Sequence, residues 1–461
     1  MAVIAKVAVQ AATYAIDKAY DYLLPEEVGG QAGCRGLVPF GRGNRLTEAM
    51  ILSLHQAVPD KPLKAVRSLL DEEPVITERE LRLALWMTRR YFCTFYDALR
   101  TVLPAAVWYH YRETWSLAQP PLVPTRQEAA VCRLLQDGPL TTDKLRQALG
   151  DDVEPLLRRM AKSGALHCKK EQSRKVRDKV VLFARLAVPA EEALALAGKS
   201  QRRREAVTFL AQNGETALHD VIYFTGVSRQ TLNALEKLGA VAYREQEEYR
   251  ISEKQYTVKA EELTLNDQQQ HVCDTLLAQV RTETPGVTLL RGVTGSGKTV
   301  VYIRLAQELL KMGRSVMILV PEIALTPQMM ARFTAYFGRE VALLHSGLRM
   351  TERYDQFKRL RRGEAHIVLG TRSAVFAPLE NLGLIIMDEE QEYTYKSENS
   401  PRYHARDAAK FRCASSNALL VLGSATPDVE SRYRAEKGVY HLFTLKNRFN
   451  ARQMPSVRIV D

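Results

Sequence analysis

Continuous apolar runs after residue 262 constrain the fold of this chain most strongly. They are VTLLRG, SVMILVPE, HIVLGT, LGLIIMDE and ALLVLGSA, and helical tracts such as TVVYIRLAQELLKMG lie between them. Strands that are apolar at successive positions are typical of a parallel sheet covered by helices, because both faces of such a sheet are buried. We therefore expect an α/β domain over residues 262–461.

A phosphate-binding motif follows the first of these runs. The segment GVTGSGKT reads G-x-x-x-x-G-K-[ST] between a predicted strand and an amphipathic helix. Gly292, Gly295 and Gly297 allow backbone N–H groups to surround phosphates. Lys298 is expected to neutralise the β and γ oxygens, and Thr299 to ligate magnesium. The motif predicts an ATP site that uses Mg²⁺.

Two carboxylates follow the apolar run LGLIIM. This run places Asp388 at the carboxyl end of a strand, where nucleotide sites lie in parallel sheets. Asp388 is expected to hold the magnesium together with Thr299, and Glu389 to orient and deprotonate the attacking water. An acidic helix start would also place a carboxylate after a strand. It would not explain the pairing with a phosphate loop.

The earlier part of the chain has a different pattern. Residues 1–110 alternate polar and apolar positions, as in MAVIAKVAV, before the helical tract ERELRLALWMTRRYF, which predicts a small β-rich domain with a helix. A partial repeat predicts two winged-helix-type modules at 121–186 and 199–250. The basic runs CKKEQSRKVRDK, where a wing would fall, and KSQRRRE either contact phosphates or are a solvated hairpin and a linker. Modules of this type also dock proteins.

Composition narrows the partners and the compartment. A formal net charge of +12 and a pI near 9.3 favour a polyanion as partner. Six cysteines without a C-x-x-C pair indicate buried, reduced thiols rather than a zinc site or disulfides. No apolar run approaches the ~20 residues of a membrane span, so we expect a cytoplasmic protein.

Six segments together resemble a known family. GVTGSGKT, VPEIALTPQ, HSGL, GTRSAVFAP, DEEQ and GSATP have the order and spacing of the first lobe of superfamily-2 helicases, specifically of the primosomal replication-restart helicases of bacteria. AYDYLLP, GCRGLVPFGRG and LKAVRSLLDEEPV resemble that family's N-terminal domain, which binds the 3′ end of a nascent strand. The resemblance implies a multidomain α/β chain with a β-rich 3′-end-binding domain, a winged-helix-type α+β middle region and a RecA-like P-loop lobe.

The resemblance also assigns DNA contacts. In this family the aromatic loop after the acidic motif touches single-stranded DNA, and here it runs from Glu392 to Arg406. The implied DNA-binding residues of this loop are Tyr393, Tyr395, Arg402, Tyr403 and His404. Tyrosines offer faces on which bases stack, and Arg402 and Arg406 are expected to meet phosphate or base. The alternative is a solvated loop ordered by its own aromatic residues.

Three further assignments rest on the same resemblance. LTLNDQQQ is similar to the family's adenine-reading segment and makes Gln269 the expected base contact. The positions that match the 3′-end pocket are Tyr20, Asp21, Gly41 and Lys64. Asp21 could accept a hydrogen bond from a 3′-hydroxyl while disfavouring a phosphate, although it could also be a turn residue. Gln391 replaces the family's histidine, so its role must be polar rather than acid–base.

The implied activity is that of an ATP-dependent 3′-to-5′ DNA helicase, a DNA-dependent ATPase, in replication restart. It would recognise stalled forks through the nascent 3′ end and promote primosome assembly, as a monomer near the nucleoid. Its expected partners are branched and single-stranded DNA, single-stranded DNA-binding protein and helicase-loader proteins. The resemblance places SVRIVD before a second motor lobe and a zinc-binding insertion. Zinc is therefore expected only in that insertion, and this chain without the second lobe is expected to hydrolyse ATP poorly. The alternatives are a non-catalytic fork-recognition scaffold or another superfamily-2 DNA translocase.

Overall fold

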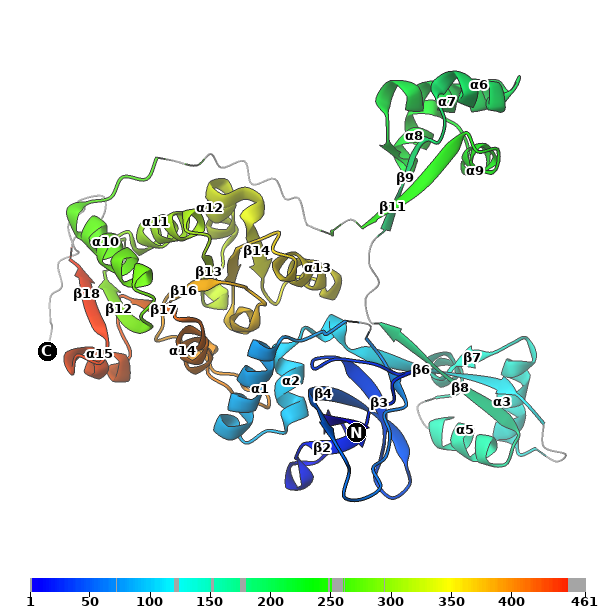
Figure 1. Cartoon of the computed structure of the whole chain (residues 1–461), viewed down its shortest axis with the longest axis horizontal. Coiled ribbons are helices and arrows are strands. Elements are labelled where there is room, and N and C mark those ends of the chain that lie inside the picture. Colours follow the sequence, from blue (N-terminus) through cyan, green and yellow to red (C-terminus); the bar gives the residue numbers. More distant parts are fainter. Residues whose placement is uncertain are drawn as a thin grey trace, which may run out of the picture. The chain divides into compact units, whose positions relative to one another are not determined.

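The computed structural model describes residues 2–446, except 72, 120–123, 151–152, 175–179, 248, 251–259, 261 and 294. The chain divides into two compact units (Figure 1). One comprises Met1–Lys175 and Lys254–Asp461, and the other comprises Val176–Glu253. In the described part of the chain, no helix combines the length and the apolar character needed to cross a membrane.

The N-terminal domain is an antiparallel sheet with two helices after it. The sheet has the order β2-β1-β4-β3-β5. Alternate residues of the first strand, Ala5, Val7 and Val9, are buried in one core, as the alternating sequence predicts. The elements are β1 (Ala2–Val9), η1 (Tyr14–Ile16), β2 (Tyr20–Leu23), β3 (Arg35–Phe40), β4 (Arg45–Ala57), β5 (Ser68–Leu69), α1 (Glu78–Tyr91), α2 (Phe95–Val102) and η2 (Ala105–Val107). Thr77 and Glu80 form a capping box that fixes the start of α1.

The first module follows the N-terminal domain within the same unit. Its elements are β6 (Tyr109–Leu117), α3 (Arg126–Gln136), β7 (Leu140–Thr141), α4 (Thr142–Leu149), α5 (Val153–Lys162) and β8 (Leu166–Arg174). Its sheet has the order β7-β6-β8. Trp115 of β6 packs with Val131 and Leu157 of the helices in a small core. The expected wing at 168–179 lies partly outside the described residues.

The second module repeats this order with one added helix. Its elements are β9 (Val180–Leu186), α6 (Ala190–Ala197), α7 (Gln201–Asn213), β10 (Thr216–Ala217), α8 (Leu218–Thr225), α9 (Arg229–Lys237) and β11 (Val241–Glu247). Its sheet has the order β10-β9-β11, so the leading strand is central, as in the first module. In the structure, the modules therefore begin at β6 and β9. Both starts lie earlier than the expected ones, residues 121 and 199.

The P-loop lobe has a seven-stranded parallel sheet with the order β14-β15-β13-β16-β17-β12-β18. The expectation of an α/β lobe is confirmed. Its helices are α10 (Asp267–Arg281), α11 (Lys298–Lys311), α12 (Pro327–Phe337), α13 (Met350–Arg361), α14 (Ala405–Ser416) and α15 (Val429–Glu436). Its strands are β12 (Gly286–Gly292), β13 (Ser315–Leu319), β14 (Val341–Leu344), β15 (Ile367–Gly370), β16 (Leu382–Met387), β17 (Leu419–Ser424) and β18 (His441–Leu445). Short 3₁₀ turns lie at η3 (Glu322–Ala324), η4 (Gly338–Glu340), η5 (Arg372–Phe376) and η6 (Tyr393–Tyr395).

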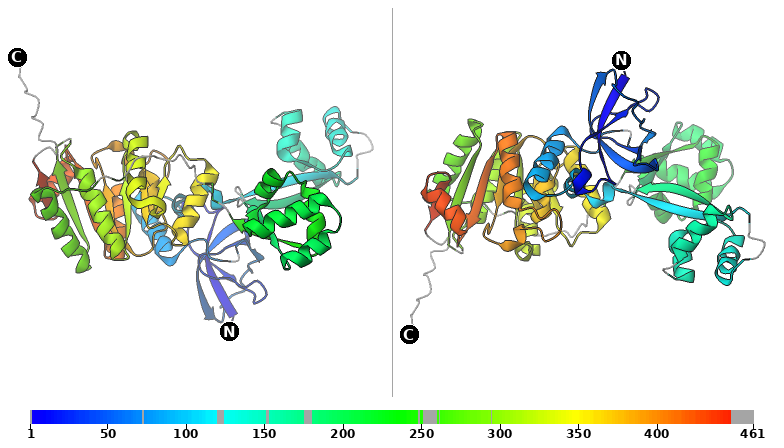
Figure 2. Two further views of the ribbon diagram at one scale, coloured as in Figure 1. Left: turned by 90° about the horizontal axis from the view of Figure 1, so that it is seen from above. Right: turned by 90° about the horizontal axis from the view of Figure 1, so that it is seen from below.

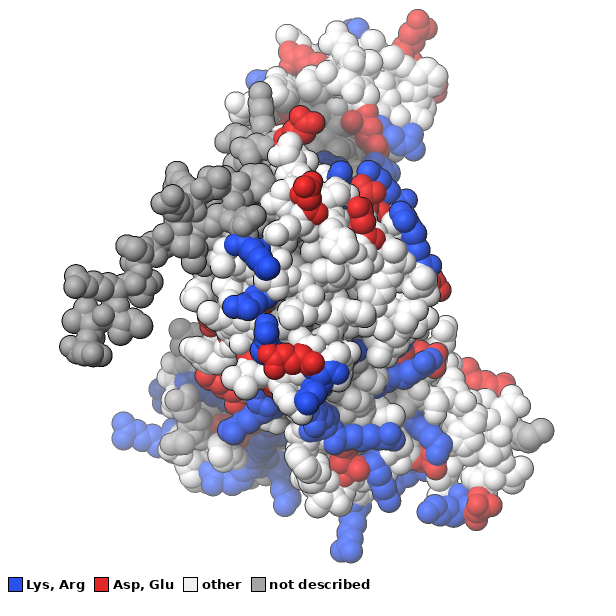
Figure 3. All heavy atoms as spheres, turned by 90° about the vertical axis from the view of Figure 1, so that its left-hand side faces the viewer, with Lys and Arg blue, Asp and Glu red and all other residues white. Residues whose placement is uncertain are grey.

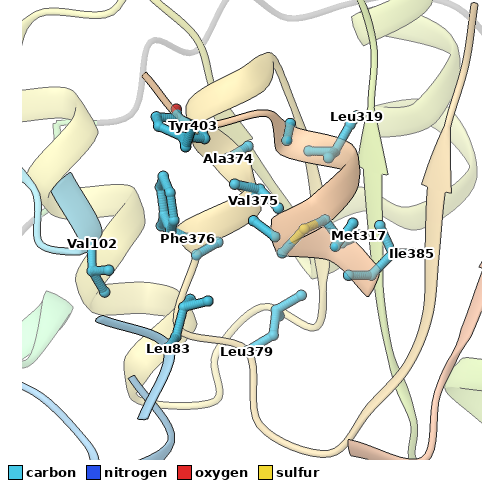
Figure 4. Packing of buried hydrophobic residues seen from close by; sticks show 14 of the residues in the cluster. Leu83, Val102, Met317, Leu319, Ala374, Val375, Phe376, Leu379, Ile385 and Tyr403 are labelled. Carbon is cyan, nitrogen blue, oxygen red and sulfur yellow. The ribbon is translucent and has the colours of Figure 1, made fainter. Parts of the chain in front are cut away.

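Helices cover both faces of this sheet (Figure 2). Alternate residues of each strand enter different cores: Ile318 of β13 packs with α10, α11 and α12, whereas its neighbour Met317 packs with α13 and α14. The core that contains Met317 also contains residues of α1 and α2, including Leu83 and Val102 (Figure 4). The N-terminal domain and the P-loop lobe therefore share one continuous apolar core.

Candidate nucleotide and nucleic-acid site

The phosphate loop lies between β12 and α11. Gly295 and Gly297 have φ values of +79° and +81°, a conformation that favours glycine. The Lys298 ammonium donates a hydrogen bond to the Gly292 carbonyl at 3.0 Å and lies 3.6 Å from Glu389 Oε1. Thr299 occupies the first turn of α11. Thr294 lies outside the described residues.

The loop has the features that a phosphate ligand requires. Ser296 Oγ is buried and has no hydrogen-bond partner among the described residues. A Cβ on Gly292 would come within 2.4 Å of this oxygen, so a larger residue there would displace the Ser296 side chain. A nucleotide phosphate group fits this loop for three reasons. Two glycines have positive φ, Lys298 is cationic, and the Ser296 hydroxyl is available as a partner.

The acidic residues lie beside this loop. Asp388 follows β16, and its Oδ1 accepts a hydrogen bond of 2.8 Å from the hydroxyl of Tyr302. Tyr302 is fully buried on α11, one helical turn after Lys298. Burial raises the pKa of Asp388, and the hydrogen bond from Tyr302 opposes that rise. Tyr302 was not predicted from the sequence, where its spacing of four residues from Lys298 is the only signal.

A chain of side-chain hydrogen bonds connects Glu389 to the GSATP segment. Glu389 adopts a φ of +47°, which is strained for a residue with a side chain. Gln391 Nε2 donates to Glu389 Oε2 at 3.0 Å, and Ser424 Oγ donates to Gln391 Oε1 at 2.6 Å. Gln391 therefore uses both ends of its amide to bridge the acidic motif and residue 424.

The third acidic residue is held by a buried network. Glu390 is 1% exposed and accepts hydrogen bonds from Arg406 Nη1, the Asp428 amide and Ser431 Oγ, each at 2.9 Å. Arg406 Nη1 also donates to Asp428 Oδ2 at 3.0 Å. Burial raises the pKa of Asp428, but the hydrogen bond and charge of Arg406, together with backbone hydrogen bonds from Glu430 and Val429, lower that pKa overall. The expected contact of Arg406 with DNA is not supported, because its guanidinium is engaged inside the protein.

The aromatic loop contains both buried and exposed rings. Tyr395 is 1% exposed, and its hydroxyl lies 2.9 Å from the Leu319 carbonyl and 2.7 Å from the Asp388 carbonyl. Tyr403 is 5% exposed and meets Phe376 edge-on at 4.9 Å (Figure 4). Base stacking by Tyr395 and Tyr403 does not fit this structure, because no open face is available. Tyr393, in contrast, is 77% exposed.

The remaining two predicted loop residues also differ in their surroundings. Arg402 is exposed. His404 caps α14, and its Nδ1 accepts a hydrogen bond from the Arg406 amide at 3.1 Å. Burial and the nearby charge of Arg406 lower the pKa of His404 to about 4, so its ring is neutral at pH 7. His404 therefore has a structural contact in addition to its expected role toward DNA.

A polar cavity of about 330 Å³ lies at the start of the aromatic loop. Its lining includes Glu322, Ser346, Arg353, Arg372, Tyr393 and Lys396. The three basic residues were not predicted as site residues from the sequence, although Arg372 belongs to the segment GTRSAVFAP. On the face that Figure 3 shows, Lys and Arg side chains lie in groups, with Asp and Glu scattered among them. The combination of cations with one exposed tyrosine suits a single nucleic-acid strand.

Gln269 is placed beside the phosphate loop. It is fully buried, and its Nε2 donates to the Ser296 carbonyl at 3.0 Å. Its Oε1 accepts a hydrogen bond from the Asn266 amide, which completes the capping box of α10. The structure thus gives Gln269 a role in holding the loop, and its contact with adenine stays a prediction.

The predicted 3′-end pocket is only partly assembled by contacts. Tyr20 meets Phe40 edge-on at 5.1 Å, and Lys64 Nζ donates to the carbonyl of the next residue, Gly41, at 2.9 Å. Asp21 instead faces Lys6 across the β1–β2 ladder, with 3.8 Å between carboxylate and ammonium. The described contacts therefore group Tyr20, Gly41 and Lys64, and they add Lys6 as the partner of Asp21.

Helix α1 contacts the aromatic loop directly. The hydroxyl of Tyr91 accepts a hydrogen bond from the His404 amide at 3.3 Å and lies 3.2 Å from Asp407 Oδ2. Trp86 stacks on Phe411 of α14 with ring centres 4.9 Å apart. The N-terminal domain is thereby connected to the loop that follows the acidic residues.

Two family models match this chain, one over the N-terminal domain and one over the P-loop lobe. Residues 6–104 match the 3′DNA-binding domain of PriA, and residues 266–434 match the DEAD/DEAH box helicase family. The fold and the site therefore define a helicase-class P-loop domain joined to a 3′DNA-binding domain. Domains of this helicase class use ATP and Mg²⁺.

Curated relatives identify the family more narrowly. The chain is 35% identical over 99% of its length to the replication restart protein PriA of Bacillus subtilis. It is 32% identical over 96% of its length to PriA of Synechocystis sp., and 30% identical over 94% to PriA of Haemophilus influenzae. The chain is thus related to the PriA replication restart proteins. It spans 57%, 55% and 51% of the lengths of these three relatives.

Proposed function

We propose that this chain is part of an ATP-dependent 3′-to-5′ DNA helicase that acts in replication restart and recognises forks through the 3′ end of the nascent strand. One observation carries the proposal. The loop that begins at the acidic residues contributes Tyr393 and Lys396 to the polar cavity, and its other end contacts α1 of the 3′DNA-binding domain through Tyr91. The elements that would bind the nucleotide, the single strand and the 3′ end of the fork are therefore in contact with one another through this loop.

The proposed roles at the nucleotide follow from the side chains present. Lys298 would bind the β and γ phosphates, and Thr299 and Asp388 would hold the magnesium ion. Two protein ligands suffice, because Mg²⁺ takes its remaining ligands from phosphates and water. Bound ATP supplies the phosphoryl group. Glu389 would orient the attacking water and accept its proton, and Gln391 would keep the Glu389 carboxylate in position.

The polar bridges suit a coupling role between nucleotide and DNA. Gln391 joins Glu389 to Ser424, and the Glu390 network joins the acidic motif to Arg406 at the end of the aromatic loop. A strand bound by Tyr393, Arg372 and Lys396 would therefore act on the same loop that the catalytic carboxylates begin. Protein partners proposed by relationship are single-stranded DNA-binding protein and helicase-loader proteins, at the nucleoid.

The test measures nucleotide binding and fork binding separately on this chain. Lys298→Ala should abolish ATP binding, because the ammonium that meets the phosphates is lost, while binding to forked DNA remains within about twofold. Lys311→Ala is the matched control, since that lysine lies at the exposed end of the same helix. Unchanged ATP binding by Lys298→Ala would disprove the nucleotide site. A parent chain that fails to prefer forks with a free 3′ end would disprove the fork role.

A further inference from the structure

The second module carries an exposed aromatic platform. Tyr223 and Phe224, adjacent residues at the end of α8, are 80% and 67% exposed. Phe224 stacks on Phe209 of α7 with ring centres 6.0 Å apart and planes at 17°, and Tyr223 meets Phe224 edge-on at 5.2 Å. The buried core of the module consists of alanine, valine and leucine side chains, and Phe209 packs against it, whereas the rings of Tyr223 and Phe224 are not needed to fill it. Exposed apolar clusters of this kind mark interaction sites.

A cavity of about 560 Å³ borders this platform. Its lining includes Lys199, Gln201, Arg204, Glu205, Phe209 and Phe224. Two cationic side chains therefore share one concave surface with two aromatic rings. We call this surface, together with Tyr223, the α7–α8 groove.

The charge of the groove favours an anion. Two of the four basic residues in the segment KSQRRRE, Lys199 and Arg204, line the groove together with one carboxylate, Glu205. In the contacts described for this module, Arg202 and Arg204 donate to the carbonyls of Gly226 and Gly198 rather than to carboxylates. Glu205 accepts a hydrogen bond from Gln201. The arginines also lie in the first turn of α7, where the helix dipole disfavours cations, so helix stability does not explain them.

We propose that the α7–α8 groove binds single-stranded nucleic acid, at a site separate from both the cavity of the aromatic loop and the 3′-end pocket. Bases would stack on Tyr223 and Phe224, and the backbone phosphates would contact Lys199 and Arg204. A single strand is favoured over a duplex, because paired bases have no free face for these rings. It is favoured over an acidic peptide because adjacent exposed rings suit successive bases. The proposal does not depend on ATP hydrolysis.

The experiment uses the whole chain without nucleotide and an oligothymidylate that carries 5-iodouracil. Light-induced crosslinks should map to the peptide that contains Tyr223 and Phe224. The double variant Tyr223→Ala/Phe224→Ala should remove these crosslinks and lower the affinity for oligothymidylate about thirtyfold, which corresponds to the loss of two stacked bases at the lower end of the stacking range. Arg204→Ala should reduce the slope of log K against log salt by about 0.7, as expected for one lost phosphate contact.

Two control variants should leave the binding of oligothymidylate to the groove intact. Leu238→Ala removes a 42% exposed apolar side chain of the same module outside the groove, and it should leave crosslinking and affinity unchanged. Lys298→Ala should keep the crosslink, so failure of the ATP site would not affect this result. Far-UV circular dichroism checks that each variant is folded.

Three outcomes would overturn the proposal. The first is an absence of crosslinks in the second module. The second is equal affinity of the parent chain and the double variant for oligothymidylate. The third is binding of an acidic, phenylalanine-containing peptide, or self-association of the chain, that depends on Tyr223 and Phe224 while oligothymidylate binding does not. In that case the groove is a protein-binding surface.

Discussion

The guanidinium of Arg406 donates a hydrogen bond to the carboxylate of Glu390 at 2.9 Å, and both side chains are buried. The same carboxylate accepts hydrogen bonds from the Asp428 amide and from Ser431. Burying a charge pair is favourable only when its remaining polar atoms are also satisfied. Here the carboxylate has three donors, whereas the buried Arg406 Nε has no hydrogen-bond partner among the described residues. The pair connects the end of the aromatic loop to the segment after GSATP.

Removal of Arg406 should therefore destabilise the P-loop lobe. Arg406→Ala leaves Glu390 buried without its cation, which is expected to cost about 3–5 kcal/mol of unfolding free energy. Denaturant unfolding of the parent and the variant measures this difference. Arg432→Ala is the control, since it breaks the exposed pair with Glu436 at 2.7 Å and should cost less than about 1 kcal/mol. Equal effects of the two substitutions would contradict the assigned role of Arg406.

Two tyrosines of the aromatic loop should respond differently to truncation. Tyr393→Ala removes an exposed ring from the polar cavity and should weaken single-stranded DNA binding by about 1–3 kcal/mol, with little effect on stability. Tyr403→Ala removes a buried ring from the core and should lower the unfolding free energy by about 3–5 kcal/mol. Equilibrium DNA binding and denaturant unfolding, measured on both variants, distinguish the roles. If Tyr403→Ala were as stable as the parent and lost DNA binding, the stacking role would be restored.

These tyrosines show what the sequence could and could not predict. The apolar runs and the GVTGSGKT motif predicted the parallel lobe, because continuous apolar strands have few other uses. The segment after Asp388 has no helical or strand periodicity of apolar residues. The sequence alone therefore does not distinguish Tyr393, which is exposed, from Tyr395 and Tyr403, which are buried. Burial there depends on neighbours that are distant in sequence, such as Phe376.

The module boundaries illustrate a second limit. The repeated helix pattern located both modules, but the strand that opens each of them precedes the helices and pairs with two strands that follow. Residues 180–186 were therefore assigned to the first module, whereas of residues 109–117 the first two were assigned to the N-terminal domain and the rest to no domain. Lys6 was missed for a similar reason, because only the pairing of β1 with β2 brings it opposite Asp21.

The neutral state of His404 should make stability depend on pH. The pKa of His404 is lowered from 6.5 to about 4 in the folded chain, first by burial and then by Arg406, while Asp407 opposes the shift. Because the unfolded chain binds the proton more tightly, the contribution of His404 is complete above pH 6.5 and is lost as the pH falls toward 4. His404→Asn keeps a capping acceptor and should flatten the stability profile between pH 6.5 and 4. An identical slope for parent and variant in unfolding experiments would exclude this role.

Asp21 should determine which 3′ terminus the N-terminal domain prefers. A terminal hydroxyl can donate a hydrogen bond to the Asp21 carboxylate, whereas a terminal phosphate would bring like charges together, at a cost that grows where water is excluded. Forks with a 3′-hydroxyl should therefore bind more tightly than forks with a 3′-phosphate. Asp21→Asn should narrow this difference, since an amide does not repel the phosphate. Equilibrium binding to forks that differ only at the 3′ terminus, at fixed salt, measures both effects.

Lys6 provides the matched control for this discrimination. Its ammonium lies 3.8 Å from the Asp21 carboxylate, and both side chains are about half exposed, so the cation offsets part of the repulsion that Asp21 exerts on a phosphate. Lys6→Gln should therefore widen the preference for the hydroxyl, in the direction opposite to Asp21→Asn. Neither change should alter the salt dependence of DNA binding by more than the equivalent of about one phosphate contact. Equal affinity of the parent chain for both forks, or the same shift in both variants, would show that Asp21 does not read the terminus.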